Sequence, residues 1–182
     1  RKCAVERRKE AGALALVGTT TAINAFLAAG GVTFTTAPDA TAPVPLSAFV
    51  NDLGNFGAGG PLQSPTIGVT LNITAVNDAP VLGPVALSID PLQTVTMTGG
   101  NMRATDVDNP AASLVFLVAG ATNGQFELAA APGVPVTSFT QAQLASGAVR
   151  FVHTNAGSGP SFSIFVTDGA AIAGPGVAVV RF

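Results

Sequence analysis

The sequence predicts an all-β protein made of tandem antiparallel β-sandwich units. Of its 182 residues, 48% are hydrophobic and only 10% are charged, which is enough apolar material for one or two small cores. The 21 glycines and 13 prolines interrupt the chain too often for long helices. Short runs rich in Val, Phe, Thr and Ile, each bounded by turn residues, recur along the second half of the chain, as expected for sandwich strands.

One structural unit occurs twice in the chain. Four landmark residues recur with a nearly constant offset, which indicates a tandem repeat. Repeat arrays usually build a rod or a surface rather than an active site. The landmark pairs are Leu27 with Leu144 and Phe34 with Phe151, each 117 residues apart, and Phe49 with Phe165 and Asp52 with Asp168, each 116 residues apart.

We expect four segments along the chain. These are a basic N-terminal segment (1–12), a first unit (13–76), an acidic linker (77–82) and a second unit (83–182). The second unit has room for several strands before its Leu144 landmark, whereas the first unit has few residues before Leu27. The first unit is therefore expected to be incomplete at its N-terminus. Either the chain is a fragment of a longer array, or another molecule supplies the missing strands.

Strands of the second unit are predicted from their composition and periodicity. In residues 161–166, Phe162, Ile164 and Val166 share one face while Phe165 lies on the other, which is the period of two of a sandwich strand. Phe126, Phe151 and Phe165 are expected to be buried. The predicted strands cover residues 95–98, 114–118, 125–128, 149–153, 161–167 and 177–182.

A single helical turn is predicted within residues 138–147 of the second unit. Thr140 is placed to cap the N-terminus of this turn, and Gly147 to end it.

Charge is distributed unevenly. Five of the eight basic residues lie within the first ten positions, and beyond them three arginines face eight acidic residues, which gives that part a net charge of −5. An acidic body argues against nucleic-acid binding, which depends on neutralising phosphates with Lys and Arg. It argues for binding of cations.

The N-terminus resembles a signal peptide only in part. A charged run (1–10) precedes an apolar run (11–17), but Thr19, Thr20, Thr21 and Asn24 interrupt the apolar stretch. No other run of 18 apolar residues exists, so no membrane span is expected. The single cysteine, Cys3, cannot form an internal disulfide and is either a free thiol or paired with another molecule.

Catalytic constellations are scarce, and we expect no enzyme. His153 is the only histidine, and it ends a predicted strand, where a hydrogen-bonded structural role is expected. With no second histidine and no cysteine in the body, neither a Cys/His pair nor a zinc site with several histidines can form. The glycine-rich run 57–60 lacks the Lys-Ser/Thr of a phosphate loop and is interpreted as a hairpin loop.

Several motifs of the chain are specific in their order and spacing. Those of the second unit are A-T-D-V-D-N-P (104–110), N-G-Q-F-E-L (123–128), V-T-S-F-T-Q-A-Q-L-A-S-G-A-V-R-F-V-H (136–153) and F-S-I-F-V-T-D-G (162–169). Those of the first unit are A-I-N-A-F-L (22–27), F-V-N-D-L-G-N (49–55) and G-A-G-G-P-L (57–62). Through these motifs the second unit resembles the cadherin-like repeat of the chondroitin-sulfate-proteoglycan type, and the first unit is similar to the cadherin-like repeats of large bacterial surface adhesins.

Aspartates near the linker predict a calcium site. Calcium takes six to eight oxygen ligands, and Asp106 and Asp108, one residue apart, can turn both carboxylates toward one point. The resemblance implies that the linker approaches this loop, although Ala79 stands where a full cadherin linker has a second acidic residue. The alternative is that these residues only form turns. The candidate ligands are Asn77, Asp78, Asp106, Asp108 and Asn109, with Asp52 or Asp168 contributing from the adjoining domain ends.

These observations predict a non-enzymatic extracellular or cell-surface module of a bacterial adhesin or surface fibre, rigidified by Ca²⁺ at the linker. Its partners would be neighbouring repeats, copies of itself, or a cell-surface or matrix ligand. The alternative is a self-assembling filament subunit, in which a strand of one copy, from 11–17 or 177–182, completes the first unit of the next. That alternative requires Leu14, Leu16, Val32 and Phe34 to be exposed. A carbohydrate-binding module ranks last, because it requires exposed aromatic platforms.

Overall fold

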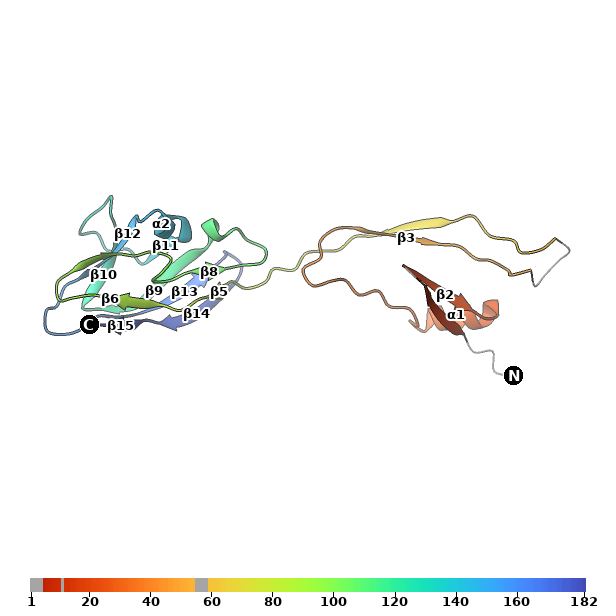
Figure 1. Cartoon of the computed structure of the whole chain (residues 1–182), viewed down its shortest axis with the longest axis horizontal. Helices are drawn as coiled ribbons and strands as arrows, with labels where there is room; N and C mark the ends of the chain where they lie inside the picture. Colours follow the sequence, from red (N-terminus) through yellow and green to blue (C-terminus); the bar gives the residue numbers. More distant parts are fainter. Residues whose placement is uncertain (1–4, 11, 55–58) are drawn as a thin grey trace. The chain divides into compact units, whose positions relative to one another are not determined.

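A computed structural model describes residues 5–10, 12–54 and 59–182 of the chain, drawn in Figure 1. The chain divides into two compact units, residues 1–73 and 74–182, and each is described by itself. Cys3, and the first half of the glycine-rich run 57–60, lie outside the described residues. No helix in the described part of the chain is long and apolar enough to cross a membrane.

The second unit is a β-sandwich of two antiparallel sheets. One sheet has four strands in the order β11-β9-β13-β14, and the other has three in the order β10-β12-β7. Several strands that are adjacent in the sheets are far apart in the chain, as are β12 and β7. Their bounds are β7 Thr94–Thr96, β9 Val115–Thr122, β10 Gly124–Leu128, β11 Ser138–Thr140, β12 Val149–His153, β13 Ser161–Thr167 and β14 Ile172–Val177.

Two short strand pairs and two short helices complete this unit. Strand β5 (Val81–Leu82) pairs with β8 (Ala104–Thr105), and β6 (Ala86–Ser88) pairs in parallel with β15 (Val179–Arg181). Strands β5, β6, β8, β11 and β14 were not predicted from the sequence. The first four span only two or three residues, too few to show a period of two. Strand β14 contains two glycines and a proline, residues that are depleted in strands. The helices are η1 (Ala111–Ser113) and α2 (Gln141–Ala145).

The predicted helical turn is confirmed as α2, together with both of its ends. The Thr140 hydroxyl accepts a hydrogen bond from the Gln143 backbone N–H, and the Gln143 side chain accepts one from the Thr140 backbone N–H. This reciprocal capping box satisfies two backbone donors at the start of the helix. Gly147 adopts φ 72°, a left-handed conformation that glycine adopts without a steric cost after a helix.

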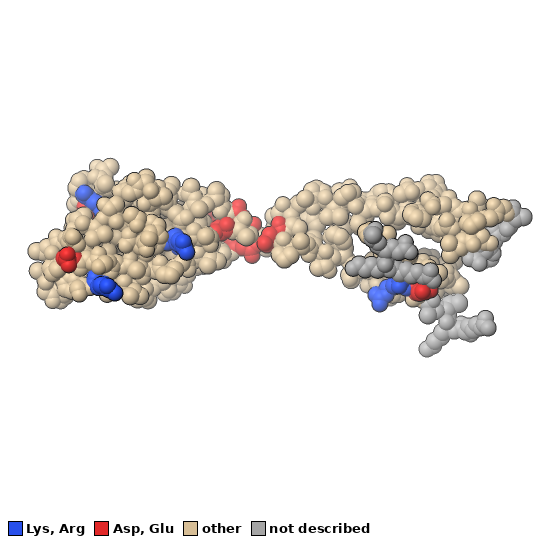
Figure 2. Space-filling view, in the orientation of Figure 1, with Lys and Arg blue, Asp and Glu red and all other residues tan. Residues whose placement is uncertain are grey.

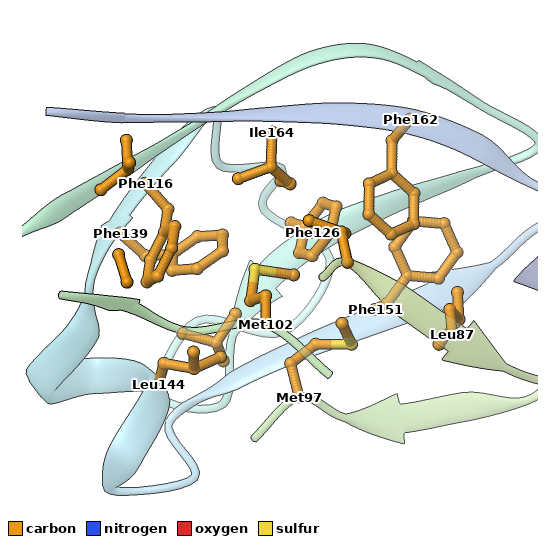
Figure 3. Close-up of a cluster of buried hydrophobic side chains, with 14 of the residues drawn as sticks. Leu87, Met97, Met102, Phe116, Phe126, Phe139, Leu144, Phe151, Phe162 and Ile164 are labelled. Carbon is orange, nitrogen blue, oxygen red and sulfur yellow. The ribbon is translucent and has the colours of Figure 1, made fainter. Parts of the chain in front are cut away.

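Aromatic side chains between the two sheets form the core of the second unit (Figure 3). The ring of Phe126 packs edge-on against Phe151 and Phe162, with ring centroids 5.1 and 4.9 Å apart. Phe126 and Phe151 are 1% and 0% exposed, which confirms their predicted burial. The prediction for Phe165 is wrong: it is only partly buried, because alternation along β13 turns Ile164 and Val166 inward and Phe165 to the opposite face.

Two polar side chains are buried in the same unit with their partners. His153 accepts a hydrogen bond at Nδ1 from the Leu92 N–H and donates from Nε2 to the Ser158 carbonyl, which confirms its structural role. Glu127 is 3% exposed and accepts from the Gly133 N–H at 2.6 Å and from Arg150 at 2.7 Å. These contacts attach the loop after β10 to the sheet.

The described residues of the first unit form two hairpins and one helix. None of its described residues is fully buried. Leu14, Val32 and Phe34 are exposed as predicted, whereas Leu16 is partly covered. Its helix was not predicted from the sequence. The elements are β1 (Glu6–Glu10), β2 (Ala13–Val17), α1 (Thr20–Ala28), β3 (Val44–Ala48) and β4 (Ile67–Leu71), with β1 paired to β2 and β3 to β4.

We predict that Phe151→Ala destabilises the second unit by about 3 to 5 kcal/mol, through lost transfer free energy and the cavity left behind. Phe34, its counterpart in the repeat, is 50% exposed, so Phe34→Ala should change stability by no more than about 0.5 kcal/mol. Urea unfolding followed by the amide signals of the unit that carries each substitution measures both effects. Equal effects of the two substitutions would contradict the register of β12.

A second prediction concerns the stability of the second unit at low pH. Burial raises the pKa of Glu127, but the Gly133 N–H and Arg150 lower it by more, so this pKa lies below its ordinary value. The stability from the ionised carboxylate is therefore present above the unfolded pKa of a glutamate, about 4.3, and is lost as the pH falls through the lower folded value. Glu127→Gln should be less stable at pH 7 and lose less stability on acidification.

Unfolding midpoints in urea between pH 7 and pH 2.5 test the acid prediction. The exposed Asp90→Asn is the matched control and should follow the wild-type pH profile. If Glu127→Gln loses as much stability as the wild type over this range, the ion pair does not carry the acid sensitivity.

Candidate cation site at the linker

The acidic loop that follows β8 is organised by one carboxylate. Asp106 Oδ1 accepts hydrogen bonds from the backbone N–H groups of Asp108 and Asn109, both at 2.8 Å. This is the turn that a short acidic side chain forms with the backbone two or three residues ahead. It leaves the other oxygen of Asp106 and the Asp108 carboxylate available for other contacts.

The linker contacts this loop directly. The backbone N–H of Asp78 donates to Asp108 Oδ2 at 2.7 Å. Asn77 donates from Nδ2 to Asp168 Oδ2 at 2.9 Å, and to the Asp78 carbonyl at 2.8 Å. Two adjacent linker residues are therefore attached to two separate loops of the second unit.

Asp168 occupies the turn between β13 and β14. Its Oδ1 accepts from the backbone N–H groups of Ala170 and Ala171, each at 2.7 Å. The Ala171 N–H, the Asn77 amide and the Ala170 N–H hold the pKa of the Asp168 carboxyl below its usual value. The carboxylate is thus stabilised in its ionised form.

Long-range strand pairing brings the two loops together. Thr167, at the end of β13, lies opposite Val115, at the start of β9, so the Asp168 turn and the segment before β9 meet at the same end of the sandwich. Several acidic residues of the second unit gather where the linker leaves it (Figure 2). We call the hydrogen-bonded set Asn77, Asp78, Asp106, Asp108, Asn109 and Asp168 the linker network.

One oxygen of the linker network lacks a partner. Asp106 Oδ2 is buried and has no hydrogen-bond partner among the residues that the structure describes. A buried polar atom without a partner is costly, by about 1 to 3 kcal/mol and more for a charged group. Such an atom calls for a bound water or ion.

The atoms of the linker network that could coordinate a metal are carboxylate, amide and carbonyl oxygens, the ligands that calcium prefers. Within residues 5–10, 12–54 and 59–182, no three acidic, histidine or cysteine side chains are grouped in a way that could hold a metal ion. A cation at this site would therefore rest on one or two carboxylates together with neutral oxygens. The chemistry of these oxygens fits calcium, and Asp106 Oδ2 is the buried oxygen among them that has no hydrogen-bond partner in the described structure.

Asp52 belongs to the first unit and is engaged in a turn there. Its Oδ1 accepts from the N–H groups of Gly54 at 2.9 Å and Leu62 at 2.8 Å. The Leu62 N–H, followed by that of Gly54, lowers the pKa of this carboxyl. Its contribution to a calcium site stays a prediction.

One residue that positions the acidic loop was not predicted from the sequence. Gln141, the first residue of α2, accepts from the Ala104 N–H at 2.7 Å and donates to the Ala104 carbonyl at 3.0 Å. Ala104 lies two residues before Asp106, so α2 holds the start of the loop. Only the tertiary contact identifies this role, because a glutamine at the start of a helix carries no distinctive signal.

Part of the chain is similar to known proteins. The chain is 35% identical to human chondroitin sulfate proteoglycan 4 over 112 residues, which is 59% of this chain and 5% of that protein. It is 38% identical to human FRAS1-related extracellular matrix protein 2 and 37% identical to extracellular matrix protein 3 of Lytechinus variegatus, each over 78 residues. These matches cover 41% of this chain and 2% of each relative.

The chain thus spans no more than 5% of the length of these relatives. No solved structure matches it significantly. The family model described as cadherin-like matches residues 81–181, which is more than half of the chain and covers the whole sandwich from β5 to β15. The protein therefore belongs to the cadherin-like family.

Proposed function

We propose that this chain is an extracellular structural repeat module whose linker is held by calcium bound at the linker network. The observation that carries the proposal is the buried, unpartnered Asp106 Oδ2 beside a second carboxylate, Asp108, that already contacts the linker. The ligands would be Asp106 and Asp108, with neutral oxygens from the loop and linker such as those of Asn109 and Asn77.

The mechanism is mechanical. Without a cation, the carboxylates of Asp106 and Asp108, one residue apart, repel each other. The linker is attached to the two loops by the single hydrogen bonds of Asn77 and Asp78. A divalent cation neutralises this charge and adds bonds between the loop and the linker. The chain that leaves the sandwich is then fixed in direction, as a load-bearing or adhesive array requires.

An extracellular location is supported by the relatives. Two of them are extracellular matrix proteins by name, and a third is a proteoglycan. These relatives are animal proteins, so a bacterial adhesin as the parent of this chain stays a prediction. A carbohydrate ligand also stays a prediction.

Joining of copies by strand addition is the second candidate function. The exposed apolar residues of the first unit favour it, since an open strand edge is a template for another strand. Sedimentation velocity of the full chain over a range of concentrations measures it, and a monomer throughout would contradict it.

We predict that calcium stabilises the chain against unfolding. Binding to the folded state alone adds RT ln(1 + [L]/Kd), about 2.7 kcal/mol at a hundredfold excess over Kd. The double variant Asp106→Asn, Asp108→Asn should lose this gain, and Asp90→Asn, an exposed aspartate outside the linker network, should keep it. Differential scanning calorimetry with calcium and with EDTA measures the effect. An unchanged melting temperature in EDTA would refute the site.

Rigidity of the linker is predicted separately. On addition of calcium, the amides of residues 76–79 should show higher backbone order by ¹⁵N relaxation of the full chain, because the cation restrains Asn77 and Asp78. In the double variant Asp106→Asn, Asp108→Asn, calcium should not change the backbone order of these amides. Stabilisation without a change in linker order would mean that calcium clamps the sandwich but not the linker.

A further inference from the structure

One tripeptide of the chain carries a modification signal that is independent of the linker network. Residues 72–74 read Asn-Ile-Thr, the only Asn-x-Ser/Thr triplet in the sequence. Such a triplet, with any residue except proline in the middle, is the acceptor of N-linked oligosaccharides in secreted proteins. Because three residues also match by chance, the way in which the fold presents them decides whether the triplet can act as an acceptor.

The triplet lies on an exposed, extended segment. Asn72 directly follows β4, and the triplet belongs to no helix or strand. Exposure alternates along this segment: Thr70, Asn72 and Thr74 are exposed, while Leu71 and Ile73 are partly buried. This is the alternation of an extended chain, in which every second side chain points to the same side. The asparagine and the threonine of the triplet therefore both face solvent on one side.

The hairpin that precedes the triplet has two different faces. One face consists only of Val, Leu, Ile and Ala, from Val44, Leu46 and Ala48 of β3 and their partners Leu71, Val69 and Ile67 of β4. The other face carries Pro45, Ser47, Gly68 and Thr70. Asn72 continues the face of Thr70, so a group attached to it projects away from the apolar face.

The amide nitrogen of Asn72 is free to react. Glycosylation forms a bond to Nδ2 of the asparagine, so an amide engaged in hydrogen bonds would have to give them up. Neither Asn72 nor Thr74 makes a side-chain hydrogen bond with any residue that the structure describes. By contrast, Nδ2 donates to a backbone carbonyl in Asn77, Asn101 and Asn123, at 2.8, 3.2 and 2.9 Å. A glycan on Asn72 thus displaces no contact of the described fold.

We propose that Asn72 is an N-glycosylation site. The donor is a lipid-linked oligosaccharide diphosphate, and an oligosaccharyltransferase catalyses the transfer. Asn72 Nδ2 attacks C1 of the first sugar and forms the N–C bond. The bond from C1 to the diphosphate oxygen breaks, the lipid diphosphate leaves, and the amide nitrogen loses one proton. The product carries a bulky, hydrophilic group at the end of β4.

Transfer occurs only on chains that enter a secretory route, so the site rests on the extracellular location in the proposed function. It does not depend on calcium binding. An added secretion signal supplies the route in the test. A failure therefore concerns the acceptor site and leaves the proposed location and the calcium site untouched.

The test secretes the full chain, fused to a signal peptide, from mammalian cells. Peptide-N-glycosidase in ¹⁸O-labelled water should lower the mass of the secreted chain and leave a labelled aspartate at position 72, which peptide mapping locates. Asn72→Gln and Thr74→Ala should lose the glycan completely, whereas Thr74→Ser, which keeps the hydroxyl, should retain it. The control Thr70→Ala removes an exposed threonine outside the triplet and should be glycosylated as the wild type is.

Two results would overturn the site: a secreted wild-type chain without a glycan, or a glycan that persists in Asn72→Gln. A second measurement tests whether the fold accommodates the sugar. The glycosylated chain and the secreted Asn72→Gln variant should unfold at the same temperature and share their amide spectra except near position 72. A lower melting temperature of the glycosylated chain would contradict the free, solvent-facing placement of Asn72.

Discussion

The structure depends on one constraint: each inner strand of the sandwich needs a hydrogen-bonded neighbour on both edges, and the chain supplies at least one neighbour from a distant segment. Strand β12 lies between β7 and β10, and β13 lies between β9 and β14. Because unpaired backbone groups are costly to bury, the strands that precede α2 and those that follow it stabilise each other. The core follows from this pairing, since Phe126, which precedes α2, packs on Phe151 and Phe162, which follow it.

The candidate cation site depends on the same pairing. Asp106 and Asp108 precede α2 in the chain, and Asp168 follows it. The pairing of β9 with β13 places both loops at one end of the sandwich. The linker residues Asn77 and Asp78 then bridge them. The strand pairing that holds the sandwich together therefore also positions the two loops that the linker contacts.

The two units contain similar local sequence patterns in different structural surroundings. Leu27 and Leu144 each lie in the last turn of a capped helix that a left-handed glycine follows. This part of each unit therefore forms without contacts to distant segments. Phe34 and Phe151 share a V-x-F pattern, yet only Phe151 lies in a strand. Local capping and turn chemistry act within a few residues, whereas a strand exists only when its neighbours do.

The sequence by itself determined the features that act over short distances. These are the period of two in β13, the cap and end of α2, the turn chemistry of Asp106 and Asp168, and the offset of the repeat. Only the tertiary structure decided which strands pair, the position of Gln141 against Ala104, and the isolation of Asp106 Oδ2. The physical reason is that pairing and burial are properties of surfaces brought together from distant segments, and a local pattern does not specify its partner.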